Sequence, residues 1–279
     1  MRDTFPYGLL IITMVVAPCN ARSPQVSDGS IRLDVLQGIP IADGVFLNGH
    51  GPYRFMLDTG AQTNQVEASL ARSLGLTPRV RVDLGTVAGA VRVPGGRVAT
   101  VSLGPNRAED QEFLFTSLAG PRQLSPTIQG VLGQEFLSRF DYLLDLAGRR
   151  LVMGQPEPSG GNRLAFQAFE GCPTIQTSEG RLMMDSGTNA VLLFHPVSGP
   201  GNARQNGEGT VRTDSGKAAV TAIPDLRLRI AEREYRPTTA AATSPESESG
   251  IDGIFTASLF RSVYISNSGK YLIVDPNSH

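Results

Sequence analysis

A chain of 279 residues is long enough for one large domain or two of ordinary size, and either can bury a sound core. Its formal net charge is −1, and its lysines and arginines are scattered along the sequence. This pattern excludes the basic patch expected of a partner of nucleic acid or of an anionic membrane surface. Plentiful glycine (31) and proline (19), with little helical periodicity, favour a mainly β protein of short strands and tight turns.

The N-terminal segment 1–21 resembles a secretory signal peptide, with an apolar run over residues 8–17 and Ala21 as a cleavage point. The run is too short to span a bilayer. We therefore expect an exported protein, periplasmic or secreted, without an integral membrane segment once the leader is removed. A lipid anchor on Cys19 is the less favoured alternative, because a proline precedes that cysteine. Without the leader, Cys172 is the remaining cysteine, so no intramolecular disulfide is expected.

The first elements after the leader read as strands. Residues 31–35 alternate between apolar and polar side chains, as a half-buried strand does. Residues 45–47 form a second apolar run, which leads through a turn at His50-Gly51-Pro52 into a strand that ends at Leu57. These patterns predict the beginning of an antiparallel sheet.

A helix fits best over Val66–Leu74, where apolar residues share one helical face and Gly75 follows as a terminator. Residues 91–98 read as a hairpin with the sequence of a tight turn at its tip. The residues of this tip are Val93, Pro94, Gly95 and Gly96. Such a hairpin is able to cover a cleft.

One outline of glycines, aromatic residues and strands occurs twice. It begins with Gly130 and the segment Val131, Leu132 and Gly133, and again with Gly250 and the segment Ile251, Asp252 and Gly253. Between the two copies, residues 154–162 are rich in proline and glycine, as linkers are. The repetition predicts a tandem duplication with an N-terminal lobe over residues 22–153, a linker over 154–162 and a C-terminal lobe over 163–279.

Two tripeptides carry the chemistry. Each has an aspartate that follows three apolar residues and precedes a hydroxyl residue and a glycine, where a charge is costly unless it is paired or functional. They are Asp58-Thr59-Gly60, followed by Ala61, and Asp185-Ser186-Gly187, followed by Thr188. Asp214-Ser215-Gly216 lacks the apolar residues before it and is predicted to be a hairpin turn. The sequence therefore predicts a pair of carboxylates, Asp58 and Asp185.

These motifs resemble those of the aspartic peptidases, in which an Asp-Thr/Ser-Gly loop and a later hydrophobic-hydrophobic-Gly segment mark each lobe. The first copy is similar to the retropepsin-like lobes of bacterial aspartyl proteases, and the whole chain resembles a pepsin-like, bilobal arrangement. The resemblance implies two similar β-barrel lobes with an active-site cleft between them. Asp252 departs from the pattern: it is a third carboxylate near the pair, a sign of a degenerate lobe, or evidence of a shifted register.

The activity implied by the resemblance is that of an aspartic endopeptidase, in which Asp58 and Asp185 activate a water against a peptide bond. The substrate would be an extended polypeptide, and neither a metal nor another cofactor is needed. Thr59 and Ser186 would hold the two loops together, Gly60 and Gly187 would allow close approach to the carboxylates, and the hairpin would act as a flap. A monomer is favoured.

Two alternatives to this function stay open. One is a homodimeric, retropepsin-type peptidase that uses only Asp58 of each chain. The other is a non-catalytic peptide-binding protein on the same fold.

The residues that follow the two tripeptides differ. A hydroxyl at Thr188 is able to stabilise an ionised Asp185, whereas Ala61 offers Asp58 nothing similar. We therefore expect Asp58 to be the acid and Asp185 the base.

Other chemistries find little support. His50, His195 and His279 are isolated in the sequence and lack the spacing of metal ligands. The sequence contains no Gly-x-Ser-x-Gly elbow, no phosphate-binding loop and no dinucleotide fingerprint. These patterns set aside serine hydrolases and nucleotide-dependent enzymes.

Overall fold

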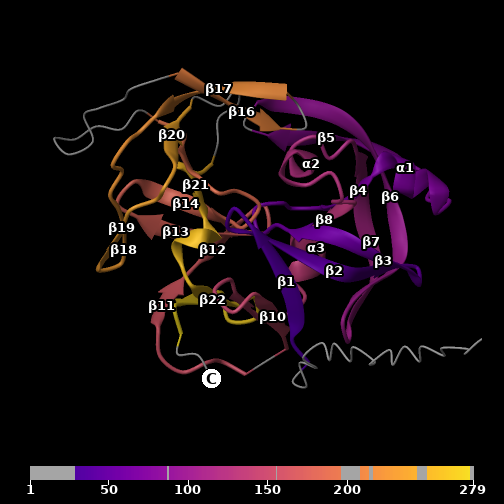
Figure 1. The fold of residues 1–279 in the computed structure, drawn as a ribbon, viewed down its shortest axis with the longest axis horizontal. Helices are drawn as coiled ribbons and strands as arrows, with labels where there is room; N and C mark the ends of the chain where they lie inside the picture. Colours follow the sequence, from indigo (N-terminus) through magenta and orange to yellow (C-terminus); the bar gives the residue numbers. More distant parts are fainter. Residues whose placement is uncertain are drawn as a thin grey trace, which may run out of the picture.

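The computed structural model describes residues 29–86, 88–154, 156–195, 208–213, 216–243 and 250–276. The predicted leader, Cys19, Asp214, Ser215 and His279 lie outside them. Over the described residues the protein is mainly β, with one sheet of 13 strands and one of 10 (Figure 1). A search of the same residues finds no helix with the length and apolar character needed to cross a membrane.

The first part of the chain forms ten strands of the larger sheet and three short helices. The strands are β1 (Ile31–Leu36), β2 (Ile39–Leu47), β3 (His50–Leu57), β4 (Asn64–Glu67), β5 (Val80–Thr86), β6 (Gly89–Leu103), β7 (Asn106–Thr116), β8 (Gly130–Leu132), β9 (Tyr142–Asp145) and β10 (Arg150–Met153). The helices are α1 (Ala68–Ser73), α2 (Pro121–Leu124) and α3 (Gln134–Leu137).

The second part of the chain contributes to both sheets. To the larger sheet it adds β11 (Asn162–Ala165), β22 (Ser262–Ser266) and β23 (Tyr271–Val274). The smaller sheet consists of β12 (Gln167–Phe169), β13 (Cys172–Thr177), β14 (Gly180–Asp185), β15 (Val191–Leu193), β16 (Glu208–Thr213), β17 (Gly216–Ala222), β18 (Leu228–Ile230), β19 (Arg233–Tyr235), β20 (Ala240–Ala242) and β21 (Gly253–Thr256). One turn of 3₁₀ helix, Ala257–Leu259, follows β21.

Strands of the two sheets pair in matching order. The path β3-β8-β4-β7-β6-β5 in the larger sheet has its counterpart in β14-β21-β15-β20-β17-β16 in the smaller one. Directions match as well: β3–β8 and β4–β7 are parallel, as are β14–β21 and β15–β20, and the other pairs along both paths are antiparallel. Each Asp-containing loop thus follows the strand that begins its path.

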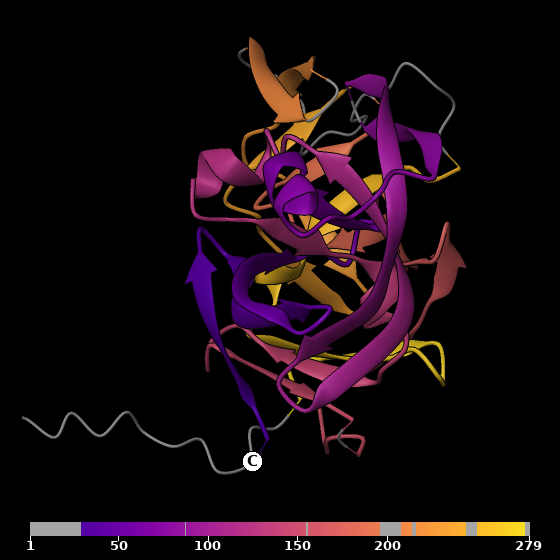
Figure 2. The same cartoon turned by 90° about the vertical axis from the view of Figure 1, so that its right-hand side faces the viewer.

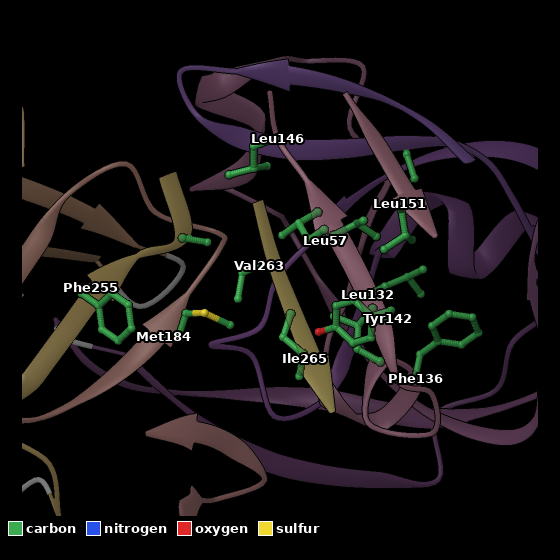
Figure 3. Close-up of a cluster of buried hydrophobic side chains, with 14 of the residues drawn as sticks. Leu57, Leu132, Phe136, Tyr142, Leu146, Leu151, Met184, Phe255, Val263 and Ile265 are labelled. Atoms are coloured by element: carbon green, nitrogen blue, oxygen red, sulfur yellow. The ribbon is translucent and has the colours of Figure 1, made fainter. Parts of the chain in front are cut away.

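Both parts of the chain share one core. Strand β22 of the second part pairs antiparallel with β9 of the first part, so that Val263 lies opposite Leu144 in the larger sheet. Figure 3 shows Val263 and Ile265 between Met184 on one side and Leu57 on the other, and all four belong to one buried cluster. Burial of these side chains holds the ends of β3 and β14 close to each other.

Two local predictions need correction. The turn before β3 lies at Asn48-Gly49 and not at residues 50–52, because His50 is already paired with Leu47. The helix begins at Ala68 and not at Val66, because residues 64–67 form β4. The side chain of Glu67 accepts hydrogen bonds from the first turn of α1 and thereby caps it.

The helix end was predicted correctly. Gly75 has φ +68°, which glycine adopts at little cost, and its N–H donates to Arg72 O at 3.0 Å.

The predicted hairpin tip at residues 93–96 is wrong. Val93, Pro94, Gly95 and Gly96 lie within β6, where Val93 pairs with Val82 of β5. The tip lies at residues 86–89, where the first strand of the hairpin turns into the second (Figure 2). Gly96 serves close packing instead of a turn, because a Cβ there would lie 2.7 Å from Thr77 O.

Candidate active site

Each aspartate of the predicted pair stands at the end of a strand that has a parallel neighbour. Asp58 follows β3, and its N–H donates to Leu132 O of β8 at 3.0 Å. Asp185 is the last residue of β14 and pairs with Thr256 of β21. Both aspartates are half-buried. The loops after β3 and β14 therefore begin from equivalent positions in the two paths.

Two hydroxyl groups lock the loops together across 127 residues of sequence. Thr59 Oγ1 donates to Met184 O at 2.8 Å and accepts from Ser186 N at 3.0 Å. In return, Ser186 Oγ donates to Leu57 O at 2.8 Å and accepts from Thr59 N at 3.0 Å. Both residues are only 1% exposed. Because each hydroxyl serves as donor and acceptor at once, only serine or threonine satisfies all four bonds.

The glycines of the two loops face the carboxyl group of the opposite loop. A Cβ on Gly60 would lie 2.6 Å from Asp185 Cγ, and one on Gly187 would lie 2.4 Å from Asp58 Oδ2. Real Cβ atoms do not approach other heavy atoms so closely. The absence of a side chain therefore permits the two carboxyl groups to meet.

The two loops bring the carboxyl groups face to face, and burial raises the pKa of both. Asp58 Oδ1 accepts from the N–H groups of Gly60 and Ala61 at 2.8 and 3.1 Å, which opposes the rise in its pKa. The negative charge of Asp58 adds to the effect of burial on Asp185 and raises the pKa of Asp185 well above its usual range. Asp185 is served in the same way, by the N–H groups of Gly187 (2.7 Å) and Thr188, so the two carboxyl groups share a proton as a coupled pair.

The sequence-based expectation that Asp58 is the acid and Asp185 the base rests on the hydroxyl of Thr188. The hydroxyl of Thr188 accepts a hydrogen bond from Ala190 N at 3.3 Å, and it is the backbone N–H of Thr188 that serves Asp185. Since any residue carries such an N–H, the hydroxyl of Thr188 does not distinguish the two sites.

The first partner segment runs beside the strand that leads to Asp58. Val131 and Leu132 pair with Met56 and Leu57, directly before Asp58. Gly133 follows at a point where a Cβ would lie 2.6 Å from Ala61 O. The glycine therefore permits β8 to pass close behind the Asp58 loop.

The second partner segment was predicted in the wrong register. Gly253 pairs with Leu182 as Gly130 pairs with Phe55, so Gly253 is the counterpart of Gly130 and not of Gly133. The counterparts of Val131, Leu132 and Gly133 are Ile254, Phe255 and Thr256, whereas Ile251 and Asp252 precede the strand.

Asp252 is therefore not a third carboxylate of the site. Its side chain is exposed, and its Oδ2 accepts from Arg181 N at 2.7 Å, near the opposite end of β14 from Asp185. The acidic residue thus caps the beginning of a strand pair, where a charge is solvated.

Two further buried residues, Gln134 and Cys172, were not assigned to the site from the sequence. Gln134 is buried, and its Nε2 donates to Thr59 O at 2.8 Å. Cys172 is a buried thiol whose pKa is raised by burial and by the charges of Asp58 and Asp185. The position of Gln134 directly after Gly133 was a usable signal, because that residue must lie beside the Asp58 loop. Nothing in the sequence around Cys172 marks it.

Neither of the two histidines in the described residues is part of the site. His50 is exposed, and the Nε2 of His195 lies 3.2 Å from Glu179 O. Within the described ranges, no group of three or more His, Cys, Asp or Glu side chains is arranged to hold a metal ion.

Comparison with known families matches the model of the aspartyl protease family to residues 44–136. No curated protein sequence matches the chain. The matched residues include the Asp58 loop, β8 and the beginning of α3, and they end before the Asp185 loop. The match supports membership of an aspartic peptidase family and, in general terms, a peptidase function.

Proposed function

We propose that the protein is an aspartic endopeptidase that hydrolyses peptide bonds through the Asp58–Asp185 pair. One observation carries the proposal: in two loops locked together across 127 residues, the glycine of each loop lies against the carboxyl group of the other, and burial raises the pKa of both aspartates. Like-charged groups held so close do not both ionise readily, so the pair keeps one proton. A shared proton is what acid–base hydrolysis by two carboxyl groups requires.

The proposed reaction uses both states of the pair. Ionised Asp58 takes a proton from a water molecule, whose oxygen attacks the scissile carbonyl carbon. Asp185 gives its proton to the carbonyl oxygen at the same time, so that no charge builds up on the carbonyl oxygen or on the attacking oxygen. Collapse of the resulting diol breaks the C–N bond: the amine leaves with the proton that Asp58 had taken, and Asp185 takes back a proton from one of the diol hydroxyls, which restores the pair.

The architecture we propose for this enzyme is two duplicated lobes, over residues 22–153 and 163–279, with the linker 154–162 and the active-site cleft between the lobes. The matching strand paths support the duplication. The substrate is an extended polypeptide. The hairpin of β5 and β6 and that of β16 and β17 lie at the same end of the molecule (Figures 1 and 2), and we assign the former as the cover of the site.

A monomer is the proposed active form. The bonds of Thr59 to Ser186 lie within one chain, and they give the Asp58 loop its partner without a second copy. This observation counts against a homodimer that uses Asp58 twice. A peptide-binding protein without hydrolysis has no observation in its favour.

The test is cleavage of an unfolded protein across pH by the wild type, Asp58→Asn and Asp185→Asn, with the oligomeric state measured alongside. Asp214→Asn is the matched control, since it changes the Asp-Ser-Gly that lacks the apolar lead-in. We expect both site variants of a monomer to lose activity and the control to retain it. Activity of Asp185→Asn in a dimer would refute the proposed pair, and a wild type that binds peptide without cleaving it would refute the enzyme.

Export is also proposed, from the resemblance of residues 1–21 to a signal peptide. Expression of the full chain in a bacterium with an outer membrane tests it, with N-terminal sequencing of the mature protein. A periplasmic product that starts after Ala21 supports the proposal, and an uncleaved cytoplasmic product contradicts it.

A further inference from the structure

Strand β5 forms one edge of the larger sheet: it pairs with β6 on one side, and no strand of the described residues lies on the other. Among the described residues, the large apolar side chains classed as exposed are two members of this strand, Val80 at 56% and Val82 at 37%. Proteins usually protect an edge strand with charge, proline or a covering loop, because its open backbone groups are a template for another strand. An apolar edge left open therefore points to a partner.

The backbone of β5 shows which residues would make that contact. In an antiparallel pair, alternate residues direct their backbone groups to the neighbouring strand and to the open edge. Arg81 lies opposite Pro94, which has no N–H to donate to it. Arg81 and Asp83 are therefore the residues whose backbone groups face outward.

The side chains of β5 are arranged so that the strand complements itself. Val80, Val82 and Leu84 share one face, and Arg81 and Asp83 share the other. When two copies run antiparallel about Val82, Val80 lies opposite the second copy's Leu84, and Arg81 lies opposite its Asp83. Neither Arg81 nor Asp83 has an ion pair with another described residue.

We propose that β5 is a self-association surface, which pairs with β5 of a second copy across a two-fold axis at Val82. Opposite charges face each other twice in this register, and the apolar residues form one continuous face. A register shifted by two residues places Arg81 opposite Arg81 or Asp83 opposite Asp83. A shift by one places charged residues opposite apolar ones.

The association is weak and depends on concentration. Pairing covers the five residues from Val80 to Leu84, and an interface of that length buries less than the ~1,200 Å² typical of stable complexes. We expect a dissociation constant of about 1 μM or weaker. The dimer leaves the Asp58–Asp185 pair of each chain intact, and the proposal does not depend on the peptidase function.

Sedimentation equilibrium over roughly 1 μM to 1 mM protein tests the proposal through charge exchange. Asp83→Arg and Arg81→Asp each place like charges opposite each other, so each variant alone should remain monomeric. A mixture of the two should form a 1:1 heterodimer, because every charged pair is then complementary. The double variant Arg81→Asp/Asp83→Arg should dimerise as the wild type does.

The mixture also controls for misfolding, since Asp83 lies opposite Arg92 of β6 and its replacement could disturb the hairpin. Variants that had lost the hairpin would not associate when mixed. A wild type that stays monomeric throughout, or single variants that dimerise as strongly as the wild type, would overturn the proposal. Wild type that stays monomeric while it captures an extended peptide of another sequence would also overturn it, in favour of a foreign strand.

Discussion

Replacement of Thr59 by valine probes the contact that holds the two loops together. The substitution conserves shape but removes the hydroxyl, and it leaves Met184 O and Ser186 N without their partner. Each buried polar group left unpaired costs about 1–3 kcal/mol, so the free energy of unfolding should fall by about 2–6 kcal/mol. At about 2–4 °C per kcal/mol for a protein of this size, a mid-range loss lowers Tm by roughly 10 °C.

Denaturant unfolding followed by circular dichroism measures this loss, with Thr59→Ser as the matched control. Serine keeps the hydroxyl and gives up one methyl group, which costs about 1 kcal/mol. A double-mutant cycle with Ser186→Ala adds a second measurement. Because the two residues share hydrogen bonds, the double variant should lose less than the sum of the single losses, by about 0.5–3 kcal/mol.

Equal stabilities of Thr59→Val and Thr59→Ser would refute this reasoning, because the hydroxyl would then contribute nothing. Strict additivity in the cycle would show that the two side chains do not share a network.

The remaining predictions concern the carboxyl pair. The pKa of Asp185 is higher in the folded than in the unfolded state, so its contribution to stability is complete below the unfolded-state pKa and is lost as pH rises through the folded-state pKa. Between these two pKa values, Tm should therefore fall less with pH in Asp185→Asn than in the wild type. Ala61→Ser adds a hydroxyl beside Asp58, which should favour the ionised form of Asp58 and move the acidic limb of the pH–rate profile to lower pH. If the alkaline limb moves instead, Asp58 is the acid of the pair. Gly187→Ala should reduce kcat about 100-fold, because its Cβ would meet Asp58 Oδ2; an unchanged kcat would contradict the packing.

Much of the local structure was predictable. The alternation in residues 31–35 and the glycine after α1 predicted β1 and the helix end, because both depend on neighbours in the sequence. The position of the hairpin tip was not predictable in this way, although Pro94-Gly95-Gly96 has the residues typical of a tight turn. Packing of Gly96 against Thr77 O keeps this segment extended, and that contact is made only once the sheet is formed.

The register of the second partner segment was predicted wrongly for a related reason. Two glycines three residues apart, Gly250 and Gly253, imitate the spacing of Gly130 and Gly133. The pairing of Gly253 with Leu182 sets the register, and a strand register follows from which apolar side chains enter the core. A single sequence does not contain that information.

By itself, the sequence determined that two aspartates, Asp58 and Asp185, end apolar strands in loops that carry a hydroxyl and a glycine. Those features are local, because the cost of a charge after a buried run can be read from its neighbours. Only the tertiary structure decided that Thr59 and Ser186 bond to each other's loops and that the glycine of each loop lies against the carboxyl group of the other. Both depend on distances between groups 127 residues apart, which exist only after the core has brought the two strands together.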